Sequence, residues 1–185
     1  MVTHMNTDFK YMKVLIVEDD PHIANIIKVV LMAFSAENVH ICSCYEDAVS
    51  TLKAEPTDCV FVDYMMSPVG GIKLIEFVRW STDPSISQLP VILCTVYTDF
   101  AKIVEARDAG VSEILAKPIT PMSIFHKTVA AVHKPRPFIN SLHFHGPDRR
   151  RRHLPRAGKI ERRACNNSVM NQSAATANLS GAINA

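Results

Sequence analysis

The chain has 185 residues, of which 48% are hydrophobic and 21% are charged, an ordinary balance for a folded domain. No apolar run approaches the roughly 20 residues that a membrane span requires, and residues 1–10 lack the apolar core of a secretory signal, so we expect a cytoplasmic protein with no membrane partner. The net charge of +2 hides an asymmetry, because residues 1–134 carry 11 Lys and Arg against 16 Asp and Glu, whereas residues 135–185 carry 9 against 2. We therefore expect an N-terminal extension (1–11), an acidic folded domain (12–134) and a basic tail (135–185).

Short apolar strands alternate with helices along the acidic part of the chain. Strands are predicted at residues 13–17, 39–43, 59–63, 91–95 and 114–116. Helices are predicted from Pro21, after an Asp that serves as N-cap, to about residue 34, and then at residues 46–54, 72–80, 99–109 (ending at Gly110) and 121–133, with a polar loop at 81–89. This alternation predicts an α/β fold, a doubly wound parallel sheet of five strands with helices on both faces.

Four of these strands carry chemical groups at their carboxyl ends. Glu18 and Asp19 follow the first strand, Asp63 ends the third, Thr95 ends the fourth and Lys117 follows the fifth. In a doubly wound sheet these ends converge on one crevice. An isolated acid at a strand end more often caps the next helix, but four complementary strand ends favour a site.

The residue types at these ends favour phosphoryl chemistry. Three crowded carboxylates need a cation, and an all-oxygen ligand set suits Mg²⁺. The lysine and the hydroxyl supply a positive charge and a hydrogen bond to an anionic group held against the metal, and a phosphoryl group fits that description. Asp63 is then the nucleophile that forms an aspartyl phosphate.

Four motifs resemble the receiver domain of bacterial response regulators. They are residues 17–21 (VEDDP), 62–66 (VDYMM), 90–95 (PVILCT) and 117–118 (KP), in order and well spaced. The resemblance covers about residues 12–133 and implies the flavodoxin-like (βα)5 fold of a chemotaxis-type, stand-alone receiver, so that residues 12–134 form the receiver domain.

The resemblance also implies a role for each site residue. Glu18, Asp19 and Asp63 would hold Mg²⁺, with the backbone carbonyl of Met65 as a further ligand. Asp63 would accept phosphate from a phosphohistidine. Thr95 would hydrogen-bond the phosphoryl group, and Lys117, whose bond to Pro118 resembles one that is cis in the family, would pair with it.

The implied function is that of a single-domain response regulator in a two-component phosphorelay. Its partners would be a sensor histidine kinase or a histidine phosphotransfer protein, and a downstream protein reached through protein–protein contact or onward phosphotransfer. Such a chain is a phosphoacceptor and not a turnover enzyme.

The sequence departs from the family pattern at several positions near the site. The loop proline is Pro68, one place later than usual, and Gly70 stands where an Asp is frequent. Val96 follows Thr95, where the family usually has Ala or Gly, and its bulk should narrow access to the phosphoryl group. Ile114 occupies the place of the aromatic switch residue, so the usual coupling between Thr95 and an aromatic ring is in doubt.

Two enzymatic alternatives fit the same strand pattern poorly. A phosphatase resembling haloacid dehalogenases needs an acid two residues after the nucleophile, where this chain has Met65. A flavin-binding electron carrier needs a hydroxyl- and glycine-rich loop after the first strand, where residues 18–20 (EDD) would repel the flavin phosphate.

The basic tail leaves a second function open. Residues 134–137 (KPRP) are incompatible with a helix, residues 138–144 are partly apolar and could dock back on the domain, and an arginine run follows at 149–152. Residues 153–185 have too few large apolar side chains to fold alone, so we expect the tail to be largely disordered. The alternative function is a nucleic-acid-binding regulator that acts through the arginine run.

Overall fold

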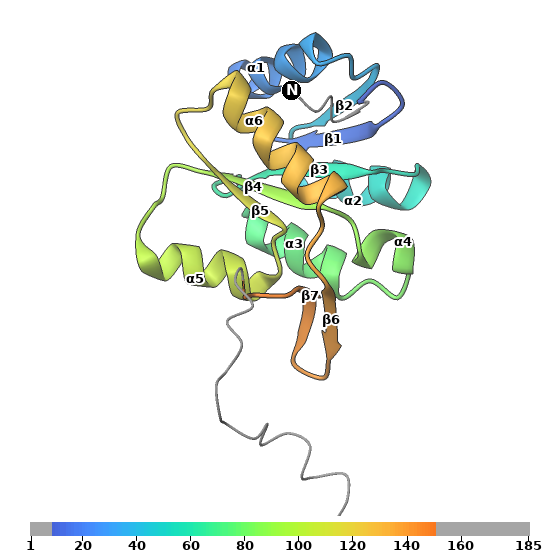
Figure 1. The fold of residues 1–185 in the computed structure, drawn as a ribbon, viewed down its shortest axis with the longest axis vertical. Helices are drawn as coiled ribbons and strands as arrows, with labels where there is room; N and C mark the ends of the chain where they lie inside the picture. The colour runs from blue at the N-terminus through green and yellow to red at the C-terminus, as the bar shows by residue number, and fades with distance from the viewer. Residues whose placement is uncertain (1–8, 151–185) are drawn as a thin grey trace, which may run out of the picture. The chain divides into compact units, whose positions relative to one another are not determined.

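A five-stranded parallel sheet forms the centre of the domain (Figure 1). The computed structural model describes residues 9–150. The strands follow the order β2-β1-β3-β4-β5, with bounds Lys13–Val17 (β1), Asn38–Cys42 (β2), Cys59–Asp63 (β3), Val91–Thr95 (β4) and Glu113–Ala116 (β5). The predicted doubly wound (βα)5 architecture is confirmed.

Helices cover both faces of this sheet. They are α1 (Pro21–Ala33), α2 (Tyr45–Ala54), α3 (Gly71–Arg79), α4 (Pro84–Ser87), α5 (Phe100–Ala109) and α6 (Pro121–Thr128), which continues as one π-helical stretch, η1 (Val129–His133). Buried side chains of α1 and α6 pack on one face, and those of α2 to α5 pack on the other. Among the described residues, no helix has the length and apolar character needed to cross a bilayer.

The structure has a short helix, α4, within residues 81–89, where the sequence predicted a polar loop. Asp83 caps this short helix by accepting a hydrogen bond from the Ser85 N–H (2.8 Å), and Pro84 occupies its first turn. The local signals for a helix start were present, and Ile86 is buried in the core. A single turn anchored by one apolar side chain is too short to show a helical period.

The register of the central strands aligns their carboxyl ends. Val17 pairs with Val62, so that Glu18 emerges beside Asp63, and Asp63 pairs with Cys94, the residue before Thr95. All five residues of β3 and of β4 are buried, because helices cover the sheet on both sides. The site side chains therefore extend from rigid, buried strands.

The core extends beyond the predicted start of the domain at residue 12. Phe9, which the sequence analysis placed in the N-terminal extension, is 1% exposed. Its ring packs edge-on against Phe34 and Phe125, with centroid distances of 6.3 and 5.7 Å. These contacts join segments far apart in the chain. The sequence around Phe9 has no periodic pattern that would predict its burial.

The core also extends beyond the predicted end at residue 134. Residues 138–147 form an antiparallel hairpin, β6 (Phe138–Ser141) and β7 (Phe144–Pro147). Ahead of it, Arg136 donates hydrogen bonds to the backbone oxygens of Val111 (3.0 Å) and Ser112 (2.6 Å). Residues 138–144 do dock back on the domain, as the sequence allowed, and Phe144 is buried, so the expected disorder of the tail does not hold for this stretch. Residues 151–185 lie outside the described residues.

Candidate functional site

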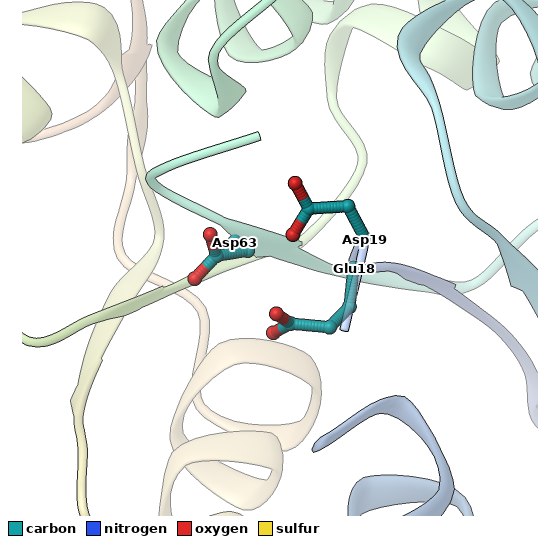
Figure 2. Close-up of side chains that lie close together, drawn as sticks. All are labelled: Glu18, Asp19 and Asp63. Atoms are coloured by element: carbon teal, nitrogen blue, oxygen red, sulfur yellow. The ribbon is translucent and has the colours of Figure 1, made fainter. Parts of the chain in front are cut away.

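Three carboxylates meet at the carboxyl edge of the sheet (Figure 2). Each of Glu18, Asp19 and Asp63 offers one oxygen, and these oxygens lie within 4.8 Å of one another. Glu18 and Asp63 are buried, whereas Asp19 is exposed. Carboxylates so close repel one another unless a positive charge lies between them.

The three consecutive acids after β1 divide into two roles. Asp20 caps helix α1, because its side chain accepts hydrogen bonds from the backbone N–H groups of His22 (2.8 Å) and Ile23 (3.4 Å). The cap fixes the chain at the turn from β1 into α1. Glu18 and Asp19 precede this turn, and their carboxylates extend toward Asp63.

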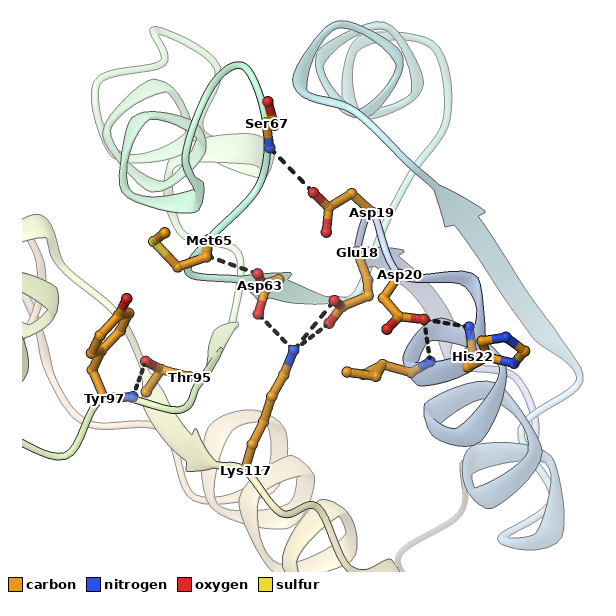
Figure 3. A network of polar contacts seen from close by, with 11 residues as sticks. Glu18, Asp19, Asp20, His22, Asp63, Met65, Ser67, Thr95, Tyr97 and Lys117 are labelled. Carbon is orange, nitrogen blue, oxygen red and sulfur yellow. Dashed lines mark hydrogen bonds and ion pairs between the residues drawn. The ribbon is translucent and has the colours of Figure 1, made fainter.

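Lys117 provides a positive charge within the carboxylate group (Figure 3). Its Nζ lies 2.8 Å from Asp63 Oδ1 and 3.0 Å from Glu18 Oε2. Burial by itself would lower the pKa of Lys117, but the hydrogen bonds to Asp63 and Glu18 outweigh it and raise that pKa. Burial also raises the pKa of Glu18, and the bond to Lys117 opposes the rise only in part. The lysine is therefore held in its charged form at the site.

The loop after β3 binds two further carboxylate oxygens. Asp63 Oδ2 accepts a hydrogen bond from the Met65 N–H (2.7 Å), and Asp19 Oδ2 accepts one from the Ser67 N–H (3.2 Å). The Met65 amide therefore orients Asp63, while the role of the Met65 carbonyl as a metal ligand stays a prediction. The Ser67–Pro68 and Lys117–Pro118 peptides are both cis.

Thr95 ends β4, the strand that pairs with β3 (Figure 3). Its hydroxyl is buried and accepts a hydrogen bond from the Tyr97 N–H at 2.9 Å. A hydroxyl that accepts one bond still has its own proton to donate. Thr95 is thus suited to donate a hydrogen bond to an anionic oxygen.

The carboxylate group fits a magnesium ion. It offers only oxygen ligands, from three acids, and oxygen is the ligand atom that Mg²⁺ prefers. The single ammonium of Lys117 offsets one of three negative charges, so a divalent cation would complete the neutralisation. The structure brings four of the selected side chains, Glu18, Asp19, Asp63 and Lys117, into one group, and it places Thr95 at the end of the neighbouring strand β4.

Gly71 allows helix α3 to start directly against the end of β3. A Cβ atom at this position would lie 2.0 Å from the Asp63 backbone oxygen and 2.7 Å from Val62 Cγ1. We expect Gly71→Ala to lower the free energy of unfolding by about 1–3 kcal/mol, as overpacking of a core does, and to slow any reaction of Asp63. Urea unfolding measures the first effect.

Gly70 provides the matched control for this substitution. A Cβ at Gly70 would lie 3.4 Å from the Tyr64 oxygen, an ordinary contact, so Gly70→Ala should cost only the roughly 0.5–1 kcal/mol of an alanine at the N-cap of α3. Equal losses for the two variants would contradict the packing argument.

The structure also shows a group of contacts beside the site, outside the phosphoacceptor residues, that the sequence analysis did not select. Tyr64, the residue after Asp63, donates a hydrogen bond from its hydroxyl to Glu105 Oε2 on α5 at 2.6 Å. Lys102, one turn earlier on α5, lies 3.0 Å from the same oxygen. The spacing of Lys102 and Glu105 is a common surface pattern on helices, so only the fold reveals that Tyr64 reaches them.

Comparisons with known proteins agree with this geometry. The family model described as "Response regulator receiver domain" matches residues 14–129. Chemotaxis protein CheY-3 of Vibrio cholerae is 31% identical over 118 residues, 64% of this chain and 89% of that protein, and chemotaxis protein CheY1 of Helicobacter pylori is 30% identical over 117 residues, 63% and 93%. A solved structure of a putative response regulator from Chloroflexus aurantiacus superimposes with a TM-score of 0.62 at 24% identity, covering 67% of this chain and 99% of that one. The chain therefore belongs to the family of response regulator receiver domains.

Proposed function

We propose that this chain is a phosphoacceptor of a two-component phosphorelay, a single-domain response regulator whose Asp63 takes a phosphoryl group from a phosphohistidine in a Mg²⁺-dependent reaction. The observation that carries the proposal is the position of Lys117, whose Nζ lies 2.8 Å from Asp63 Oδ1, within a group of three carboxylates. An ammonium beside a nucleophilic carboxylate, in a site with ligands for a divalent cation, is suited to a transferring phosphoryl group.

The reaction follows from the atoms at the site. A carboxylate oxygen of Asp63 forms a bond to phosphorus while the phosphorus–nitrogen bond of the donor histidine breaks, and the electron pair of that bond returns to the imidazole nitrogen. Lys117 pairs with a phosphoryl oxygen as charge develops, and the Thr95 hydroxyl donates a hydrogen bond to another. Mg²⁺, held by Glu18, Asp19, Asp63 and the Met65 carbonyl, would supply further neutralisation of the phosphoryl charge.

The surface beside the site supports a protein partner. Met65, Val96 and Phe100 belong to the two loops beside Asp63 and to the start of α5, and all three side chains are exposed. Exposed apolar side chains beside a polar site suit contact with another protein surface. A histidine kinase or a histidine phosphotransfer protein would bring the phosphohistidine to this side, and output would follow through contact with a downstream protein or through onward transfer.

The structure gives no specific support to the nucleic-acid alternative. Two of the tail's described arginines are engaged with the domain: Arg136 with the Val111 and Ser112 carbonyls, and Arg149 with Asp108 at 2.9 Å. Arg151 and Arg152 lie outside the described residues. We therefore propose the phosphoacceptor function alone.

Intact-mass measurement tests the proposal directly. After incubation with acetyl phosphate and Mg²⁺, the wild type should gain the mass of one phosphoryl group, and Asp63→Asn should gain none, because an amide is not nucleophilic enough to attack phosphorus. Removal of Mg²⁺ with a chelator should abolish the adduct on the wild type.

Asp47→Asn is the matched control, since Asp47 is an exposed acid in the first turn of α2. It should form the adduct as the wild type does. An equal adduct on Asp63→Asn, or no adduct on the wild type under conditions that modify another receiver, would refute the proposal.

A further inference from the structure

A chain of contacts begins at the residue next to Asp63. The Tyr64 side chain is buried, and its ring packs edge-on against the Tyr97 ring, with a centroid distance of 5.4 Å. Tyr97 is also the residue whose N–H binds the Thr95 hydroxyl at 2.9 Å. Tyr64 therefore contacts the residue whose backbone N–H binds the Thr95 hydroxyl.

Glu105 on helix α5 is the next residue in this chain of contacts. The Tyr64 hydroxyl donates to Glu105 Oε2 at 2.6 Å, and Lys102 Nζ, 3.0 Å from the same oxygen, lies 5.2 Å from the centre of the Tyr64 ring. The hydrogen bonds from Tyr64 and Lys102 lower the pKa of Glu105, so it accepts both bonds as a carboxylate. The end of β3 is thus tied to α5 by a short, charge-assisted hydrogen bond.

The other end of α5 contacts the C-terminal hairpin. Asp108 Oδ1 lies 2.9 Å from Arg149 Nη1, and the Arg149 guanidinium lies 4.5 Å from the centre of the Phe144 ring. The backbones also touch, because a Cβ atom on Gly110 would lie 2.8 Å from the His145 oxygen. Gly110 ends α5 with a φ of 96°, a conformation that suits glycine. This end of α5 and the hairpin are therefore in direct contact.

The hairpin in turn contacts the single tryptophan of the chain. The His145 ring lies 4.4 Å from the Trp80 ring, centroid to centroid, and Trp80 is the C-cap of α3. Trp80 is 56% exposed, and the His145 ring lies over it, so we expect its emission to change when the position of His145 changes. The chain carries its own optical reporter of hairpin position.

We propose that α5 couples the phosphoacceptor to the β6–β7 hairpin, through Tyr64 and Glu105 at one end and through Asp108 and Arg149 at the other. When Asp63 carries a phosphoryl group, Thr95 turns toward it and releases the Tyr97 N–H, so the packing of Tyr97 on Tyr64 changes. Helix α5 passes this change to the hairpin, and the position of His145 on Trp80 shifts. The proposal rests on the proposed function, and it provides a route of coupling in a chain that has Ile114 in place of the family's aromatic switch residue.

The coupling requires that each contact differ between the two states of the domain. A contact transmits a change only if its free energy differs between those states, and the 2.6 Å bond from the Tyr64 hydroxyl to the Glu105 carboxylate is the contact that joins the end of β3 to α5. The hydroxyl of Tyr64 and the carboxylate of Glu105 are therefore the groups to remove.

The experiment follows Trp80 emission of the full chain during phosphorylation by acetyl phosphate with Mg²⁺, with intact mass measured on the same samples. The wild type should show an adduct and a shift in emission. Tyr64→Phe, Glu105→Gln and Arg149→Ala should form the adduct and lose the shift. Glu37→Gln, which removes an exposed carboxylate paired with Lys10 at 3.8 Å, should keep both.

Two comparisons separate the outcomes. His145→Ala should change the resting emission, and an unchanged emission would show that the Trp80–His145 contact is absent in solution, which overturns the coupling. An adduct on the wild type with no shift, or a full shift in both Tyr64→Phe and Glu105→Gln, also overturns the coupling and leaves the proposed function intact. Absence of the adduct itself refutes the proposed function and removes the trigger on which the coupling depends.

Discussion

Lys117→Met is expected to destabilise the metal-free protein by about 3–5 kcal/mol and to abolish or strongly slow phosphorylation of Asp63. Lys117 is 12% exposed, and its carboxylate partners Glu18 and Asp63 are 3% and 7% exposed at their side chains. The variant leaves these two buried negative charges without their cation, and the cost of a buried uncompensated charge is large. Addition of Mg²⁺ should recover part of the loss, because a ligand that binds only the folded state stabilises it.

Urea unfolding with and without Mg²⁺ measures this effect, and its pH dependence provides a further check. Burial raises the pKa of Glu18 even with Lys117 present, and loss of the ammonium should raise it further. The folded variant then binds more protons than the unfolded chain, so the loss of stability should shrink as pH falls and grow as pH rises through the raised pKa.

Lys73→Met is the matched control for Lys117→Met. Lys73 pairs with Glu76 at 2.8 Å, but its side chain is 68% exposed, so its removal should cost less than about 1 kcal/mol. An equally small loss for Lys117→Met, or a loss that Mg²⁺ leaves unchanged, would contradict the view that Lys117 compensates the carboxylates.

Arg79→Ala is expected to lower the free energy of unfolding by roughly 3–5 kcal/mol, a large share of the stability of a small domain. Arg79 is 1% exposed and donates hydrogen bonds to the backbone oxygens of Gly110 (2.7 Å), Leu89 (2.8 Å) and Ser87 (2.9 Å). Burial, with Arg136 nearby, lowers the pKa of Arg79 to about 9, so the guanidinium is still charged at neutral pH. The alanine variant leaves three carbonyls without this donor and leaves a cavity between α3, α4 and the turn after α5.

Denaturant unfolding of two further variants defines the role of Arg79. Arg79→Lys keeps the charge but has a single donor centre in place of a planar fork, so its loss should be intermediate. Arg107→Ala removes an exposed arginine of α5 and should change stability by about 0.5 kcal/mol at most. A loss below about 1 kcal/mol for Arg79→Ala would show that water replaces the guanidinium at little cost.

The sequence by itself determined the sheet and the carboxylate group. The strand over residues 59–63 was predictable because four uncharged, mostly β-prone residues lead into one acid. A strand that is buried on both faces is a continuous apolar run and shows no alternation of polar and apolar residues. Parallel strands place their carboxyl ends at one edge of the sheet. Glu18, Asp63, Thr95 and Lys117 each lie at or just after the carboxyl end of a predicted strand, so the sequence predicted that they lie at the same edge.

The tertiary structure alone decided the contacts between segments distant in the sequence. Phe9 packs on Phe125, Tyr64 contacts Glu105, and His145 of the hairpin lies against Gly110 at the end of α5, yet none of these pairings has a local period or motif. A basic, proline-bearing segment has the composition of a solvated tail, and it is ordered here because Arg136 and Arg149 find a carbonyl and a carboxylate on the domain. Local propensity predicts which residues form a helix or a strand. The contact partner of a polar side chain depends on which distant segment the fold places beside it.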